Sequence, residues 1–177
     1  MPTLFARIVT RLDLDNRLRP DSLKRSALQC SMAAGVVLLL LLVLDTVTQT
    51  VLIAALGAST FIAFAVPRST ASSPRCIVGG YLAGIVAGSS MATLNISLGL
   101  STFMNGNLGM IIFGALATGL AMLLMVVTKT EHPPAAALAL GLILNEWTSI
   151  TLLVVMVGVV GLSLCKQLVL PHLMDLS

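Results

Sequence analysis

The chain has 177 residues, of which 57% are hydrophobic and only 10% are charged. A soluble domain typically carries about 25% charged residues, so this composition excludes a soluble globular domain and indicates an integral membrane protein. The net charge is +3, but aromatic residues do not interleave with the basic ones, so nucleic acid is not an expected partner. The three cysteines stand at no metal-ligand spacing, and neither a metal nor another cofactor is expected.

Residues 1–22 form the first segment of the chain. Apolar residues recur there at helical spacing, interleaved with basic ones. This pattern fits either an amphipathic helix in the lipid headgroup region or a solvated basic tail on the cytoplasmic side. The basic residues are Arg7, Arg11, Arg17 and Arg19.

The remaining residues, 23–170, are predicted to form one transmembrane domain with an all-α fold, a polytopic helix bundle. Six apolar segments are expected, at 23–44, 51–66, 76–98, 108–128, 134–145 and 148–165. Four of them have roughly the 17–25 residues that a membrane-spanning helix needs. The second and fifth are short, and a 12-residue helix covers only about 18 Å of a hydrocarbon core about 30 Å thick.

The cations predict the orientation of the segments. If all six segments cross and the N-terminus is cytoplasmic, then Arg68, Arg75, Lys129 and Lys166 lie on the inner side, while the outer loops contain no Lys or Arg. This is the distribution that the positive-inside rule requires. We therefore expect a multi-pass protein of a bacterial inner membrane, with both termini in the cytoplasm.

An internal repeat relates the two halves of the domain. Without a gap, residues 35–57 align with residues 119–141, which pairs the first segment with the fourth and the short second with the short fifth. Each half (about 23–98 and about 107–165) then has three crossings, so the halves are inverted relative to each other. Short or broken middle helices at matching positions of such 3+3 inverted repeats mark the binding site of many transporters. Two short helices that merely pack are the alternative.

The stretch "TKTEHPP" carries the strongest local signal. Pro133 and Pro134 disfavour helix before them and suit a first helical turn after them. Residues 128–132 should therefore enter the membrane unwound, with the short helix starting near mid-depth. The repeat places residues 45–50 in the mirrored position, so two helix N-termini would approach the midplane. Such N-termini, with free amides and positive partial charge, bind anions.

We expect the binding residues to lie around these two N-termini, and each has an alternative structural role. His132 either contacts substrate or locks the turn, and the hydroxyls either face the cavity or bond carbonyls of their own helices. Glu131 either pairs with Lys129 at the inner surface or couples transport to protons. The candidates for substrate binding are Thr130, His132, Pro133, Pro134, Thr48, Thr50, Gly57, Ser59 and Thr60. The candidates for coupling or gating are Glu131, Lys129 and Arg75.

Two blocks of the sequence resemble the HPP family of membrane proteins. One is "HPPAAAL" at 132–138, and the other is "GASTFIAFAVPRSTASSPRCIVGG" at 57–80. The resemblance implies a membrane fold and, because plastid and cyanobacterial members are associated with nitrite transport, nitrite as first candidate substrate. Tyr81 departs from the pattern, since a His is common there. The matching motif positions are Gly57, Ala58, Ser59, Pro74, Arg75, Gly79, Gly80, His132, Pro133 and Pro134.

The expected function is thus a transporter or channel for a small monovalent anion, which would bind near the midplane. The expected partners are this inorganic anion and the lipid bilayer, and a homo-oligomer is left open. A membrane scaffold or sensor without transport activity is the alternative. An enzyme is not expected, because the sequence offers no serine an obvious base and no metal-binding cluster.

Overall fold

The computed structural model describes residues 20–43, 50–99 and 106–176, and their regular structure is entirely helical. Helices were found at all six predicted positions, with ends within about four residues of those expected. The four long helices are α3 (Pro20–Val43), α5 (Pro74–Leu98), α7 (Gly106–Thr128) and α9 (Ser149–Val169). The two short ones are α4 (Thr50–Ala65) and α8 (Pro133–Leu144), and two 3₁₀ turns are η1 (Thr70–Ser72) and η2 (Leu170–His172).

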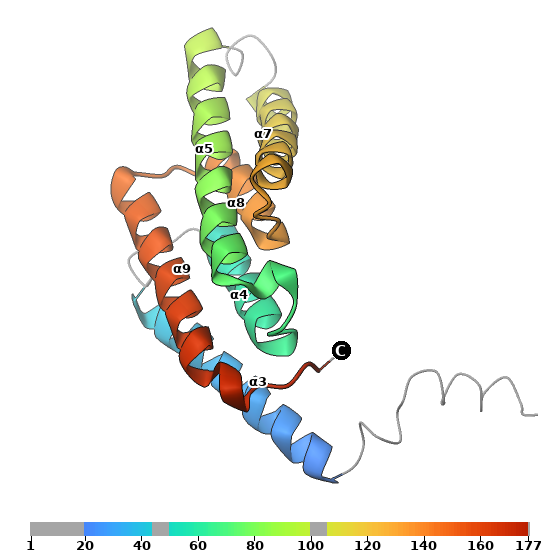
Figure 1. Ribbon diagram of the computed structural model, residues 1–177. Coiled ribbons are helices and arrows are strands. Elements are labelled where there is room, and N and C mark those ends of the chain that lie inside the picture. The colour runs from blue at the N-terminus through green and yellow to red at the C-terminus, as the bar shows by residue number, and fades with distance from the viewer. Residues whose placement is uncertain (1–19, 44–49, 100–105, 177) are drawn as a thin grey trace, which may run out of the picture.

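Three helices of the described residues are long and apolar enough to cross a membrane, namely α5, α7 and α9, the last together with η2. Their outer faces carry large apolar side chains, such as Ile96 and Leu168, which are 78% and 80% exposed. Such exposure suits lipid and not water. Figure 1 shows α5 and α7 side by side with α8 packed against both, while α3 packs mainly on α4.

Local sequence explains where the helices begin and end. The Ser73 hydroxyl accepts from the amide of Cys76 and caps α5, and Pro74 takes the first helical position, where its missing N–H costs nothing. Gly99 ends α5 in the left-handed conformation, at φ 60°. Pro133 begins α8 in the same way, directly after the extended residue His132. The predicted effect of the two prolines is confirmed.

The polar segment before α8 is shorter than predicted. Helix α7 continues to Thr128 and closes with a left-handed Lys129, at φ 55°, after which the Thr130 amide donates back to the Met125 carbonyl. Only residues 130–132 are left to bridge to α8, and three extended residues reach at most about 10 Å. Together with the 12 residues of α8, or about 18 Å, they nearly match a hydrocarbon core of about 30 Å.

A stripe of glycines on α5 receives this segment and α8. Because Gly80, Gly84 and Gly88 lack side chains, the backbone of α8 and its lead-in lies against α5. A Cβ atom at Gly84 would lie 2.5 Å from the Ala135 carbonyl oxygen, and one at Gly88 would lie 2.9 Å from that of Ala139. These glycines therefore let the two helices approach closely, and the partner is α8 within the same chain.

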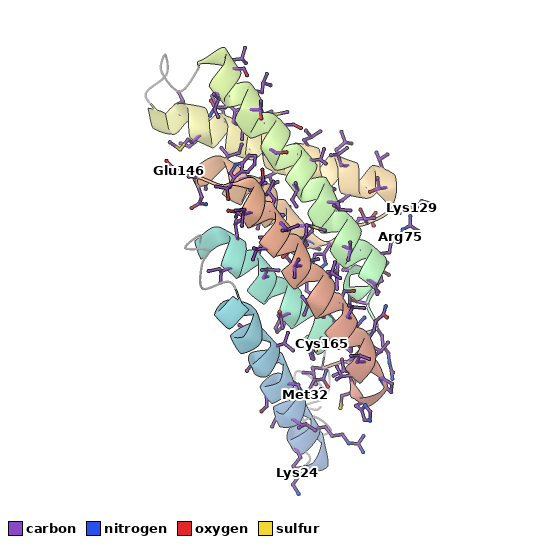
Figure 2. All side chains as sticks on the ribbon, turned by 90° about the vertical axis from the view of Figure 1, so that its left-hand side faces the viewer. Lys24, Met32, Arg75, Lys129, Glu146 and Cys165 are labelled. Atoms are coloured by element: carbon purple, nitrogen blue, oxygen red, sulfur yellow. The ribbon has the colours of Figure 1, made fainter. Side chains whose placement is uncertain are left out.

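The charged ends of the bundle are separated as the sequence predicts. Figure 2 shows Arg75 and Lys129 together at one end and Glu146 at the other end. Beside Glu146, the indole N–H of Trp147 donates to the Leu142 carbonyl oxygen at 2.9 Å. The chain therefore runs from one end of this part of the bundle to the other between Lys129 and Glu146, and whether the fifth segment crosses the membrane stays a prediction. We call the Arg75 and Lys129 end the inner end, after the predicted orientation.

The C-terminal segment returns to the same end as the first turns of α3. The Gln29 amide nitrogen donates to the carbonyl oxygens of Phe64 and Met174, and the Leu176 amide donates to that of Ala65. These bonds complete the C-terminal carbonyls of α4, which its own helix leaves unpaired. The beginning of α3 and the C-terminal segment thus lie at the same end of the bundle. The number of crossings and the compartment that this end faces stay predictions.

The helix contacts correspond only partly to an inverted repeat. An inverted repeat would match α3 with α7, α4 with α8, and α5 with α9. Two contacts agree with this matching: α3 packs on α4 as α7 packs on α8, and α5 packs on α8 as α9 packs on α4. The close pair α5 and α7 has no counterpart among the main contacts of the described residues, where α9 would meet α3. The 3+3 repeat stays a prediction. Residues 1–19 of the predicted N-terminal segment lie outside the described residues.

Candidate functional site

Three buried polar side chains meet where α4, α5 and the start of α8 converge. The Ser59 hydroxyl lies 2.8 Å from the Tyr81 hydroxyl and 2.8 Å from Nε2 of His132. Ser59 and Tyr81 are fully buried, and His132 is 1% exposed. Helices α4, α5 and α8 thus each contribute one member of what we call the Ser59–Tyr81–His132 cluster. It is the largest group of mutually bonded polar side chains in the described part of the bundle.

The hydrogen-bond partners determine where the protons lie. Nδ1 of His132 is 2.8 Å from the carbonyl oxygen of Ala71, which can only accept, so Nδ1 carries a proton. In the neutral imidazole, Nε2 then accepts from the Ser59 hydroxyl, and Ser59 accepts from Tyr81. If His132 gained a second proton, the Ser59 hydroxyl could turn to the Ala55 carbonyl oxygen, 3.0 Å away. Every polar atom of the cluster is paired in either protonation state.

This geometry corrects one expectation, because Ser59 does have a base partner. A serine bonded to an imidazole whose other nitrogen is held by an acceptor is the arrangement that activates serine nucleophiles. Here, however, Ser59 is fully buried and already accepts from Tyr81. A substrate would have to displace these contacts to reach the oxygen, so in this arrangement the cluster can relay protons and offer donors but cannot attack an external group.

The cluster lies closer to the inner end than the expected midplane. Gly80, against which His132 packs, is the sixth residue after Pro74, so it lies about 9 Å along the 25-residue helix α5. The cluster lies there because only residues 129–132 separate α7 from α8. The contribution of α4 also differs from the prediction, because α4 contacts His132 through Ser59, near the middle of α4 and about 13 Å along that helix from Thr50. Two helix N-termini do not meet at this site.

The predicted free amides at the start of α8 are not available. A helix leaves its first amides unpaired, but Pro133 and Pro134 have no N–H, and the Ala135 amide donates to the His132 carbonyl oxygen at 2.9 Å. The first three residues of α8 therefore offer no free amide to an anion, unlike the expected backbone site at this N-terminus. Side chains supply further hydrogen-bonding groups nearby, namely the two hydroxyls and the imidazole of the cluster.

The remaining predicted binding residues have mainly structural contacts. Thr130 is 7% exposed, and its hydroxyl lies 2.7 Å from that of Thr128. The Thr60 hydroxyl donates to the Leu56 carbonyl oxygen of its own helix, so it follows the structural alternative. A Cβ atom at Gly57 would meet nothing within 4 Å, and Pro134 is buried while Pro133 is exposed. Thr48 and the side chain of Thr50 lie outside the described residues.

The predicted coupling residues lie at the surface of the inner end. Arg75 is exposed, and its guanidinium donates to the Thr128 carbonyl oxygen at 3.0 Å, where a cation complements the C-terminal dipole of α7. Lys129 and Glu131 are also exposed, and no ion pair joins these two described residues. The expected surface pair is thus not formed, and none of the three side chains enters the cluster.

A hollow of about 200 Å³ lies beside the cluster, between α7 and the start of α8. Its walls are mainly apolar, from residues such as Met122, Met125 and Ala136, and only Glu131 and His132 bring polar groups to it. The cluster's hydroxyls thus face one another and do not line an open polar cavity. In this arrangement the site is closed.

Sequence reasoning missed Tyr81 and placed Lys166 only at the inner surface. A single tyrosine in the glycine-rich face of an apolar helix is a usable signal, because a buried phenol usually requires a hydrogen-bond partner. For Lys166 the signal is its position, four residues after Leu162 on the buried face of α9.

The comparisons with known proteins address the family. No curated protein and no solved structure matches the chain. A family model described as HPP, transmembrane region, matches residues 19–173, which include every described helix and the whole cluster. This span is far more than half of the 177 residues. The chain therefore belongs to the HPP family of transmembrane proteins.

Proposed function

We propose that this protein is a transporter or channel for a small monovalent anion, with nitrite as the first candidate. The observation that supports the proposal is the Ser59–Tyr81–His132 cluster, a group of hydrogen-bonding side chains enclosed in an otherwise apolar bundle. Polar groups at such depth are costly and commonly mark substrate or ion pathways. Nitrite comes from the family resemblance and not from the geometry.

The chemistry of the cluster favours an anion over a cation. Its members offer O–H and N–H donors, and no carboxylate of the described residues takes part in it; the nearest acid along the chain, Glu131, is exposed. Metal cations and ammonium ions require oxygen acceptors, whereas an anion requires donors. The first turn of α8 also directs its positive dipole end toward His132, which adds attraction without free amides.

Binding requires the closed cluster to open. An anion that enters must replace at least one of the present hydrogen bonds. The simplest to replace is the bond of 2.8 Å between Ser59 Oγ and His132 Nε2. The two hydroxyls would then donate to the anion, and Nε2 of His132 would do so once the imidazole carries its second proton. The apolar hollow beside His132 offers volume into which the start of α8 could move.

Uptake into liposomes tests this proposal. The reconstituted protein should take up nitrite, and His132→Ala should reduce the initial rate by about 10–100-fold, the value of one hydrogen bond to a charged group. Thr130→Val, which keeps the shape of the side chain on Gly79, should also reduce uptake. The matched control is Thr60→Val, whose hydroxyl bonds only its own helix. Normal uptake by both test variants would refute the assigned site.

A scaffold or sensor without transport activity is the second candidate, and the closed site favours it. All hydrogen bonds of the cluster are satisfied internally, and the adjoining hollow is mainly apolar. This alternative predicts liposomes that take up no nitrite, nitrate or chloride above protein-free vesicles. His132→Ala would then change thermal stability alone.

A further inference from the structure

Lys166 is a buried cation near the inner end of α9. The buried residues Thr151, Val155, Leu162 and Lys166 recur at intervals of four or seven, so Lys166 continues the face that α9 turns toward the bundle. Its side chain is only 3% exposed. Lysines near the end of a membrane helix commonly extend toward the headgroups. The side chain of Lys166 points into the bundle instead, although the end of the helix is close. In Figure 2, the neighbouring Cys165 is labelled and shows where this part of α9 lies.

The ammonium group of Lys166 has one protein acceptor. Nζ donates to the carbonyl oxygen of Ser72 at 2.8 Å, which leaves two of its three N–H donors without a hydrogen bond within the described residues. No carboxylate of the described residues forms an ion pair with it. A buried charge without a counter-charge is strongly unfavourable, so a counter-ion would stabilise the charged form of Lys166.

Two serine hydroxyls in the turn that Lys166 contacts also lack partners. The Oγ atoms of Ser69 and Ser72 are buried without a hydrogen bond, and Ser72 is fully buried. Ser69 is the extended residue before η1, and the Ser72 amide donates to its carbonyl oxygen at 3.1 Å. This bond keeps Ser69 within one turn of Ser72, whose own carbonyl oxygen accepts from the ammonium.

We propose that Lys166, Ser72 and Ser69 form a binding site for a small inorganic anion at the inner end of the bundle. The ammonium supplies the charge and the two free donors, and the hydroxyls supply two more. A small monovalent anion such as nitrite, nitrate or chloride would neutralise the lysine and complete all three unsatisfied groups. The enclosure of Lys166 favours such an ion over the phosphate of a lipid headgroup.

The site is adjacent to the Ser59–Tyr81–His132 cluster through one short turn. His132 donates to the Ala71 carbonyl oxygen and Lys166 donates to that of the next residue, Ser72. If the proposed transport is correct, this is where an anion would meet the cluster from the inner side. The binding proposal does not rest on transport, because an unpaired buried lysine attracts an anion in a scaffold as well.

Thermal unfolding of the purified protein in uncharged detergent tests the site. Nitrite, nitrate or chloride replaces gluconate, a larger anion, at constant ionic strength. The midpoint of the wild type should rise with the logarithm of the anion concentration once this exceeds the dissociation constant, and the rise should reach about 5–10 °C at a hundred times that constant. Lys166→Met should lose this dependence and, in gluconate, unfold no earlier than the wild type, because its buried unpaired charge is gone. Ser72→Ala should move the onset of the rise to higher anion concentration, and exposed Lys24→Met is the matched control.

Several results would overturn the proposal. A wild-type midpoint that is the same in all anions would do so, as would a Lys166→Met variant that keeps the full response. Stabilisation by anionic phospholipid but not by inorganic anions would assign Lys166 to a lipid headgroup instead. If Lys166→Met fails to fold, Ser72→Ala and the wild-type titration still decide. Anion binding without uptake into liposomes would refute the transport function alone.

Discussion

Gly80→Ala should disturb the Ser59–Tyr81–His132 cluster although residue 80 takes no part in it. The added methyl carbon would lie 2.7 Å from Cβ of His132 and 3.1 Å from the Thr130 carbonyl oxygen. Carbon atoms in ordinary contact are about 3.5–4.0 Å apart, so the segment before α8 must move by about 1 Å. Neither neighbour is the end of a flexible side chain, and the strain therefore falls on the backbone.

The size of the effect follows from this displacement. A shift of about 1 Å would lengthen the contact between His132 Nε2 and Ser59 Oγ from 2.8 Å to a distance at which no hydrogen bond remains. Overpacking of a tight contact typically costs about 1–3 kcal/mol, and the lost hydrogen bond adds about 1 kcal/mol. We expect the free energy of unfolding to fall by about 2–4 kcal/mol, and nitrite uptake to fall with it.

The measurement is chemical unfolding in detergent, with uptake assayed in liposomes. Gly161→Ala is the control, because a Cβ atom there meets nothing within 4 Å and the residue is exposed on α9. It should be neutral or slightly stabilising, since alanine is the better helix former. Equal stability and equal uptake of the two variants would refute the reasoning that the α5 glycines position His132.

Two further predictions concern stability in the same unfolding assay. Ser59→Ala removes the hydroxyl that both Tyr81 and His132 contact, and leaving these buried groups unpaired should lower the free energy of unfolding by about 1–3 kcal/mol. Thr60→Ala loses only a hydrogen bond within its own helix and should lower it clearly less. Equal losses of stability in the two variants would contradict the central role of Ser59. Lys129→Gly should stabilise the protein by about 1 kcal/mol, because residue 129 has a φ of 55° that glycine adopts without strain. Lys129→Ala keeps the strain and serves as its control, and an unchanged midpoint for the glycine variant would show that the left-handed turn carries no strain.

Features that depend on neighbouring residues were predictable. The prolines at 133 and 134 lack amide hydrogens whatever the fold, so the start of α8 could be predicted to within one residue. The glycines at 80, 84 and 88 indicated close packing, because their four-residue spacing places them on one helix face. Ser59 and His132 were both identified as site residues, although their direct contact was not predicted.

Features that depend on depth and on distant partners were not predictable. The number of unwound residues after α7 was overestimated, because the left-handed turn at Lys129 ends that helix later than the prolines alone suggest. That difference moved the site from the midplane toward the inner end. The Ala135 amide was expected to be free and is bonded instead. Tyr81 was read only as a departure from the family pattern.

The sequence by itself determined a helical membrane protein of the HPP family, the positions of six helices and the separation of charge between the two ends. These properties follow from the length and polarity of each segment and from backbone limits of proline, all of which are local. Only the tertiary structure decided that Ser59 meets His132, 73 residues away, and that Lys166 turns inward onto Ser72, 94 residues away. Such contacts depend on how helices pack against one another, and the energy of a buried polar group depends on the partner that packing provides.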